Sequence, residues 1–169
     1  MSDQPANSYQ RWPEPARAIC VALDDAVSAA RAAEPADFAQ ARIDLLKLDR
    51  EQLNALVGAV TRDLLERFNP DGLDAEGVEA AVRGCAAAAA GWYPTLNAET
   101  LLWALVGALG MADAEERDDT SYEEQLAHSL LLMSSLLGDA ARADASVTTA
   151  GVLAAALGEI RRAETMEMP

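Results

Sequence analysis

The fold is decided by residues 98–112, which read AETLLWALVGALGMA. Apolar side chains cover nearly the whole circumference of the helix that this stretch predicts, and a helix of that kind is normally central and buried. Asn97 stands just before it, where a short polar side chain can cap the first turn. We therefore expect this helix to form one half of a central apolar hairpin, spanning about residues 98–137.

A leucine-rich run that ends at Gly138 predicts the second half of the hairpin. Ser121 followed by Glu124 has the spacing of a capping box. The apolar residues of this run occupy more than one helical face: Leu126, Leu130, Leu131, Leu132, Met133, Leu136 and Leu137. Other helices of the same chain can cover the surplus, or a second copy can cover it by forming a two-fold homodimer through Leu130–Leu137.

Five further segments with apolar residues at helical spacing flank this hairpin. Alanine and leucine dominate the composition, whereas the β-branched and aromatic residues that strands prefer are scarce. We therefore predict an all-α fold, a compact bundle of six to seven helices. The number depends on whether residues 37–48 and 50–68 form one bent helix or two. Residues 1–14 are expected to be a flexible arm, 15–163 a single helical domain and 164–169 a frayed tail.

The charge balance narrows the classes of partner. The chain has 28 acidic and 13 basic residues, a net charge of −15. Such a chain repels nucleic-acid phosphates and anionic membrane surfaces, so we expect neither as a direct partner. The most apolar run is shorter than the roughly 20 residues that span a bilayer, and the N-terminus lacks the apolar core of a signal peptide. We expect a cytoplasmic protein, and the preference for arginine over lysine is typical of a high-GC bacterial genome.

No residue constellation specifies a reaction, a metal or a cofactor. The single histidine, His128, follows Gln125 where a di-iron helical bundle has glutamate at the same spacing. Cys20 and Cys85 lie in unrelated apolar stretches and are expected to be buried thiols. Nucleophile-elbow and phosphate-loop motifs are absent from the sequence. We therefore expect no catalytic residues and no cofactor, which disfavours an enzyme.

Two stretches are candidate binding sites. Trp92 and Tyr93, together with Trp103, are aromatic side chains with a polar tip, a type enriched in ligand sites. The acidic connection could dock a basic protein partner through Asp113, Glu115, Glu116, Asp118 and Asp119. The favoured hypothesis is a non-catalytic protein-interaction or regulatory module. A small-molecule-binding protein with a pocket near Trp92, Tyr93 and Trp103 is the alternative, and an acidic mimic of nucleic acid is a third.

Overall fold

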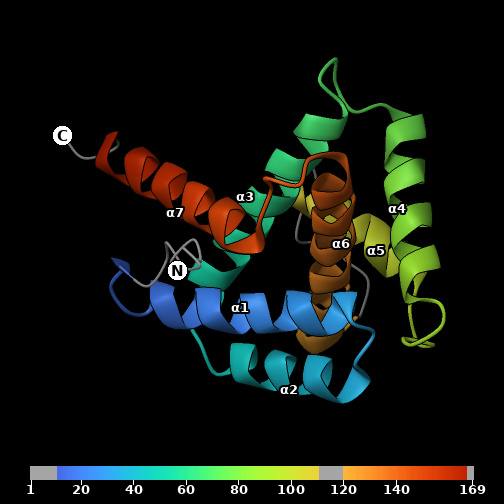
Figure 1. Cartoon of the computed structure of the whole chain (residues 1–169), viewed down its shortest axis with the longest axis horizontal. Coiled ribbons are helices and arrows are strands. Elements are labelled where there is room, and N and C mark those ends of the chain that lie inside the picture. The colour runs from blue at the N-terminus through green and yellow to red at the C-terminus, as the bar shows by residue number, and fades with distance from the viewer. Residues whose placement is uncertain (1–10, 111–119, 167–169) are drawn as a thin grey trace.

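The chain folds into a bundle of helices, as Figure 1 shows. The computed structural model describes residues 11–110 and 120–166, which contain seven helices and no strand. This confirms the all-α prediction. The helices are α1 (Ala16–Arg31), α2 (Pro35–Leu46), α3 (Arg50–Phe68), α4 (Ala75–Ala89), α5 (Ala98–Ala108), α6 (Tyr122–Ala143) and α7 (Thr149–Met166).

Short polar side chains begin five of the helices. The side chain of Asp49 accepts a hydrogen bond from the backbone N–H of Gln52, so α3 starts where the capping pattern predicts. Four further helices are capped in the same way, by Asp74, Asn97, Ser121 and Thr148. Because α2 ends at Leu46 and Asp49 caps a new helix, residues 37–48 and 50–68 belong to two helices.

The centre of the bundle is α6. It packs against α1, α2, α3, α4 and α5, and Figure 1 shows it running through the middle of the molecule. Its buried residues cover the whole circumference of the helix and include all of Leu130, Leu131, Leu132, Met133, Leu136 and Leu137. The surplus apolar surface is therefore covered inside one chain. These leucines offer a second copy no exposed patch, which removes the reason for a homodimer through Leu130–Leu137.

The other half of the hairpin, α5, is less buried than the sequence indicates. Only Thr100, Leu101 and Leu105 are buried along it, and Leu102 is 41% exposed. The expectation of a helix buried on all sides is wrong. The reason is that α3, α4 and α6 cover one face of α5, and no other described helix packs closely over the opposite face.

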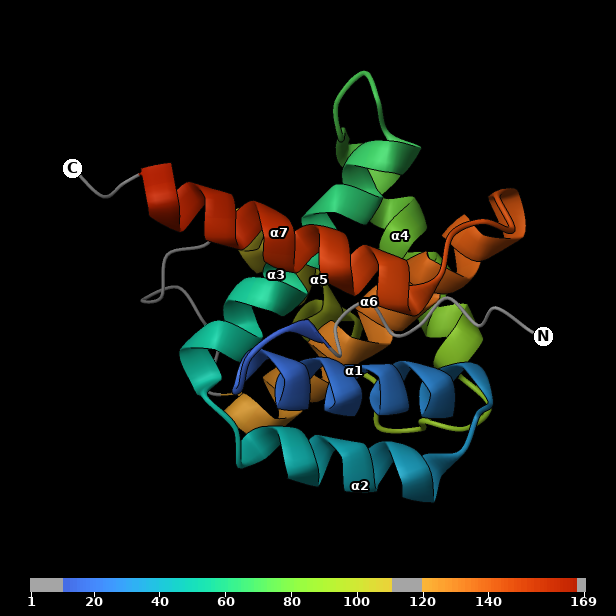
Figure 2. The same cartoon turned by 60° about the vertical axis from the view of Figure 1, so that its left-hand side comes forward.

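The remaining helices enclose α6 from different sides. In Figures 1 and 2, α1 and α2 lie side by side below it, while α4 stands at one edge next to α5. α7 crosses α3 and α1 and continues to Met166, pointing away from the bundle. The guanidinium carbon of Arg161 on α7 lies 5.0 Å from the ring centre of Trp12, so this part of the expected N-terminal arm contacts the bundle.

None of the helices in the described ranges combines the length and apolar character that a bilayer-spanning segment needs.

Candidate binding site

A cavity of about 180 Å³ lies between α3, α5 and α6. Its apolar wall includes Val57 from α3, Trp103 from α5, and Leu126 and Leu132 from α6. Val57, Leu126 and Leu132 are buried core residues, whereas Trp103 is half-buried. Three helices that pack on one another thus supply the wall, which makes it part of the folded core.

Missing and short side chains create the space. Gly58 lies in the middle of α3, and a Cβ atom added there would meet no atom within 4 Å. On α5 the wall is formed by Ala104, Gly107 and Ala108, which share one face because they are three or four residues apart. Glycine within a helix costs about 1 kcal/mol relative to alanine. At Gly58 no steric contact requires glycine, and its effect is to leave the cavity unfilled.

Several polar groups of the wall already have partners in the protein. The Thr61 hydroxyl donates to the carbonyl oxygen of Val57 at 2.8 Å, within the same helix. The Tyr122 hydroxyl donates to the side-chain oxygen of Asn54 at 2.9 Å and so joins α6 to α3. The side-chain amide of Gln125 donates to the carbonyl oxygen of Thr120 at 2.8 Å. These bonds shape the wall and leave those donor groups unavailable to a ligand.

Of the other lining residues, three on α5 and α6 have hydrogen-bonding groups without such partners. Within residues 11–110 and 120–166, the Thr100 hydroxyl, the Trp103 indole N–H and the Ser129 hydroxyl make no side-chain hydrogen bond. We call these three the uncommitted groups. None of the polar side-chain atoms that are fully buried in this part of the chain lacks a partner. The uncommitted groups are therefore accessible to a small molecule or to water.

The part of the wall that residues 11–110 and 120–166 form carries no charged side chain. No Asp, Glu, Lys, Arg or His is among the described residues that line it. Its one titratable group is the phenol of Tyr122, whose pKa is raised by burial against the opposing effects of Arg50 and Asn54. The Arg50 guanidinium carbon lies 3.8 Å from the centre of the Tyr122 ring. Tyr122 therefore stays neutral at physiological pH.

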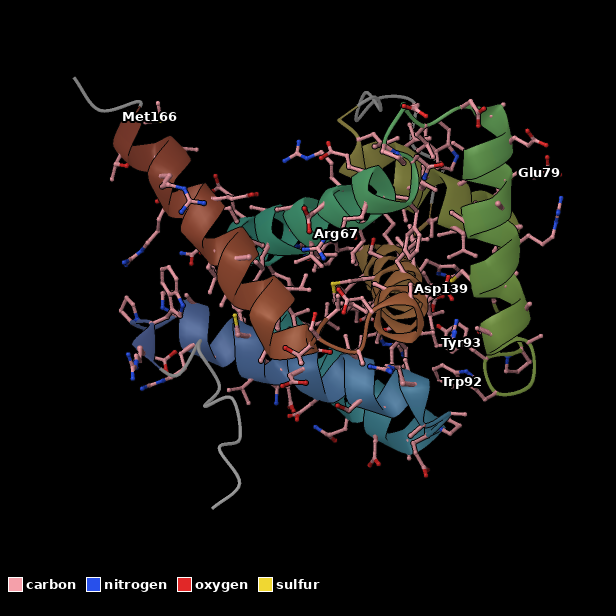
Figure 3. All side chains as sticks on the ribbon, turned by 45° about the horizontal axis from the view of Figure 1, so that its top comes forward. Arg67, Glu79, Trp92, Tyr93, Asp139 and Met166 are labelled. Atoms are coloured by element: carbon pink, nitrogen blue, oxygen red, sulfur yellow. The ribbon has the colours of Figure 1, made fainter. Side chains whose placement is uncertain are left out.

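The structure separates the three aromatic residues that the sequence groups as one pocket. Trp103 lines the cavity described above, which neither Trp92 nor Tyr93 borders. Trp92 and Tyr93 pack edge-on against Phe38, with ring centres 5.3 and 5.9 Å away, and Figure 3 places both at the end of α4 beside α2. The Tyr93 hydroxyl accepts a hydrogen bond from Arg42 at 3.2 Å. These two aromatics anchor the corner between α4 and α5 on α2.

His128 belongs to the same corner and is 1% exposed. Its Nε2 atom accepts a hydrogen bond from the backbone N–H of Asn97 at 3.0 Å. The proton of a neutral imidazole is then on Nδ1, which lies 2.7 Å from the carbonyl oxygen of Glu124 and donates to it. Both nitrogens are thus occupied: Nε2 joins the start of α5 to α6, and Nδ1 bonds within α6. Among the described residues, no cluster of three His, Cys, Asp or Glu side chains could hold a metal ion.

A second cavity, of about 320 Å³, borders Trp92 and has a different character. Arg31, Arg142 and Asp139 line it, and Arg142 is paired with Asp139. Cys85 also lines it, but its thiol is buried and burial raises its pKa to about 12, with a further contribution from Asp139. A thiol with that pKa is protonated at neutral pH and is a poor nucleophile.

The acidic residues expected to dock a partner lie outside the described residues: Asp113, Glu115, Glu116, Asp118 and Asp119. Gly58 and Ser129, conversely, line the cavity without having been identified as site residues from the sequence. An isolated glycine inside an otherwise regular helical pattern is a signal that could have pointed to Gly58. Ser129 gives no comparable signal, because serine on a helix surface is common.

Comparisons of the chain with models of known families, with curated proteins and with solved structures found no match.

Proposed function

We propose that the protein is a non-catalytic binding protein that holds a small molecule in the cavity between α3, α5 and α6. The observation that carries this proposal is the cavity itself, an apolar wall in which a few polar groups have no protein partner. Small-molecule sites are typically concave, mostly apolar and furnished with a small number of placed polar groups. Trp103, one of the aromatic residues that suggest a ligand site in the sequence, forms part of this wall.

The composition of the wall favours binding over catalysis. Acid–base and nucleophilic mechanisms use a titratable side chain in contact with the substrate, usually beside a second polar group that orients it. Tyr122 is the one titratable residue among the described lining residues, and its hydroxyl donates to Asn54. A bound molecule would meet hydroxyl, amide and indole groups, which recognise a ligand without transforming it.

A fragment screen by ligand-observed NMR tests the proposal. Fragments that bind the protein are tested again on Gly58→Leu, in which the new side chain occupies the open space beside α3. The control is Gly84→Leu on α4, because Gly84 is also a helical glycine whose added Cβ would meet no atom within 4 Å. We expect hits that Gly58→Leu abolishes and Gly84→Leu retains. Hits that bind both variants equally would place the site elsewhere and would contradict the proposal.

An interaction module remains the second candidate, and a groove between α1 and α2 favours it. Val21, which is 44% exposed, lies in this groove together with Leu48. Asp25 and Asp44 flank it, and burial, together with the charges of Asp24 and Asp44, raises the pKa of Asp25. An amphipathic partner segment with leucine and arginine side chains would match both features. A labelled Leu/Arg helical peptide tests this candidate: an affinity that Val21→Ala and Asp44→Asn leave unchanged would contradict it.

The nucleic-acid mimic has less support. A mimic needs a continuous acidic face, and exposed arginine–carboxylate pairs interrupt the acidic surface on several helices. Arg67 pairs with Asp63 on α3, and Arg83 pairs with Glu79 on α4. Figure 3 shows Arg67 and Glu79 on separate helices of the bundle, so positive charge is distributed along with the negative.

A further inference from the structure

We infer that the cavity between α3, α5 and α6 selects a small uncharged aromatic molecule, one ring in size, that carries a single hydroxyl or similar hydrogen-bonding group. This inference rests on the proposed function and names the chemical class of its ligand.

The volume of the cavity limits the size of the ligand. The cavity measures about 180 Å³. An apolar protein cavity of about 150 Å³ holds one benzene molecule. The space between the three helices therefore matches one ring with a short substituent, whereas a fused cofactor or a nucleotide would extend beyond it.

The lack of charged side chains among the described lining residues limits the charge of the ligand. An ion that leaves water for an uncharged wall loses its hydration and gains no counter-charge, which makes its binding unfavourable. The described lining residues contain no charged side chain that could compensate an anion or a cation. The net charge of −15 further opposes an anion. A neutral molecule has neither penalty.

The aromatic and hydrogen-bonding groups of the wall indicate the chemical groups of the ligand. The rings of Trp103 and Tyr122 both line the cavity, and aromatic rings favour edge-on or offset contacts with another ring. Ser129 and Thr100 each have a hydroxyl without a partner among the described residues, and the Trp103 indole N–H can donate as well. A ligand hydroxyl can accept from one of these groups and donate to another. Benzene itself would leave them unpaired.

The experiment is a titration of the full chain, labelled with ¹⁵N, with four one-ring probes of matched size: phenol, toluene, benzoate and benzylammonium. Amide chemical-shift changes report where each probe binds and how tightly. We expect phenol to bind most tightly, with shifts concentrated in α3, α5 and α6. We expect toluene to bind more weakly, and benzoate and benzylammonium not to bind at this site.

Three variants make the result specific. Gly58→Leu should abolish phenol binding, and Gly84→Leu should retain it. Each of these two variants is used only if its melting temperature is at least that of the wild type. Ser129→Ala removes one hydroxyl and should weaken phenol binding about 3- to 10-fold, the usual effect of one neutral hydrogen bond. It should leave toluene binding unchanged, and that difference separates a lost hydrogen bond from a disturbed fold.

The contradicting outcomes are distinct. Tighter binding of benzoate or benzylammonium than of phenol, abolished by Gly58→Leu, would overturn the neutral ligand class and leave the proposed function standing. Equal binding of toluene and phenol would overturn the hydrogen-bonding requirement. If none of the four probes binds, the inference fails. The proposed function fails with it only if the fragment screen also yields no hit that Gly58→Leu abolishes.

Discussion

The imidazole of His128 accepts a hydrogen bond from the backbone N–H of Asn97 at 3.0 Å, and this contact ties the start of α5 to the middle of α6. Asn97 is also the capping residue of α5, because its side-chain oxygen accepts from the backbone N–H of Thr100 at 3.1 Å. His128 therefore holds in place Asn97, the residue that caps α5. α5 supplies Trp103 to the cavity, so the position of that wall depends on this corner.

Replacing His128 by alanine should lower the free energy of unfolding by about 2–4 kcal/mol, since it removes a buried ring and leaves the Asn97 N–H without its acceptor. Urea denaturation followed by circular dichroism measures the change. The control is Glu124→Ala. The Glu124 carboxylate lies 3.9 Å from Nδ1 of His128 and is 44% exposed, so its loss should cost less than about 0.5 kcal/mol. Equal losses in the two variants would contradict the structural role of the His128–Asn97 bond.

The two faces of α5 should respond differently to truncation. Leu105 is fully buried, so Leu105→Ala should destabilise the protein by about 2–5 kcal/mol. Leu102 is exposed on the same helix, and Leu102→Ala should change the stability by no more than about 0.5 kcal/mol. Urea unfolding midpoints of the two variants give the comparison. A large loss for Leu102→Ala would mean that something covers this face of α5 in solution.

We expect the protein to lose stability at alkaline pH because of its two buried cysteines. Burial raises the pKa of Cys20 and of Cys85 from 9.0 to about 12. Below pH 9 both thiols are protonated in the folded and the unfolded chain alike. Between pH 9 and pH 12 the unfolded chain loses these protons first, so the equilibrium shifts toward unfolding as the pH rises.

The measurement is the urea midpoint at pH 7.5 and at pH 10, for the wild type and for Cys20→Ala/Cys85→Ala. We expect the wild-type midpoint to fall more steeply with pH than the midpoint of the double variant. We also expect both thiols of the native protein to react slowly with a disulfide reagent at pH 7.5 and to react fully in urea. Parallel pH dependence in the two proteins would show that other groups cause the alkaline loss.

Sedimentation equilibrium should give a single species of 17.9 kDa at low and at moderate salt. The reason is that the surplus leucines of α6 are buried within the chain and have no apolar patch to share. Added salt screens the repulsion between copies with a charge of −15. A dimer that persists in moderate salt, and that Leu102→Ala dissociates, would identify the exposed face of α5 as the contact surface.

Local patterns predict the helices well because a helix is specified by its own residues. The spacing of Leu53, Leu56, Val57 and Val60 and the capping by Asp49 are both visible in the sequence, and α3 follows them. Burial of α5 is not predicted in the same way. Apolar residues around a whole helix show which side chains can be buried. Which of them are buried depends on how many helices pack against it, and more helices pack against α6 than against α5.

The site is only partly predictable for a similar reason. The sequence predicts Trp103 as a ligand-binding residue but groups it with Trp92 and Tyr93, which pack on Phe38 instead. The packing of the α4–α5 corner decides which aromatic rings share a space, and neither residue type nor spacing contains that information. Gly58 cannot be predicted as a cavity residue from its own position, because the cavity forms only where small residues of separate helices lie next to one another.

The central position of α6 also matters while the chain is being synthesised. α6 begins at Tyr122 of a chain of 169 residues, so α1 to α5 leave the ribosome before the helix on which they all pack exists. Until then their apolar faces, including that of Ile19 and Leu23, lack one of their native partners. Nascent chains with exposed apolar surface associate with one another or with chaperones. A ribosome-bound chain stopped before Tyr122 is therefore expected to remain uncompacted, and the bundle to form only after α6 has emerged.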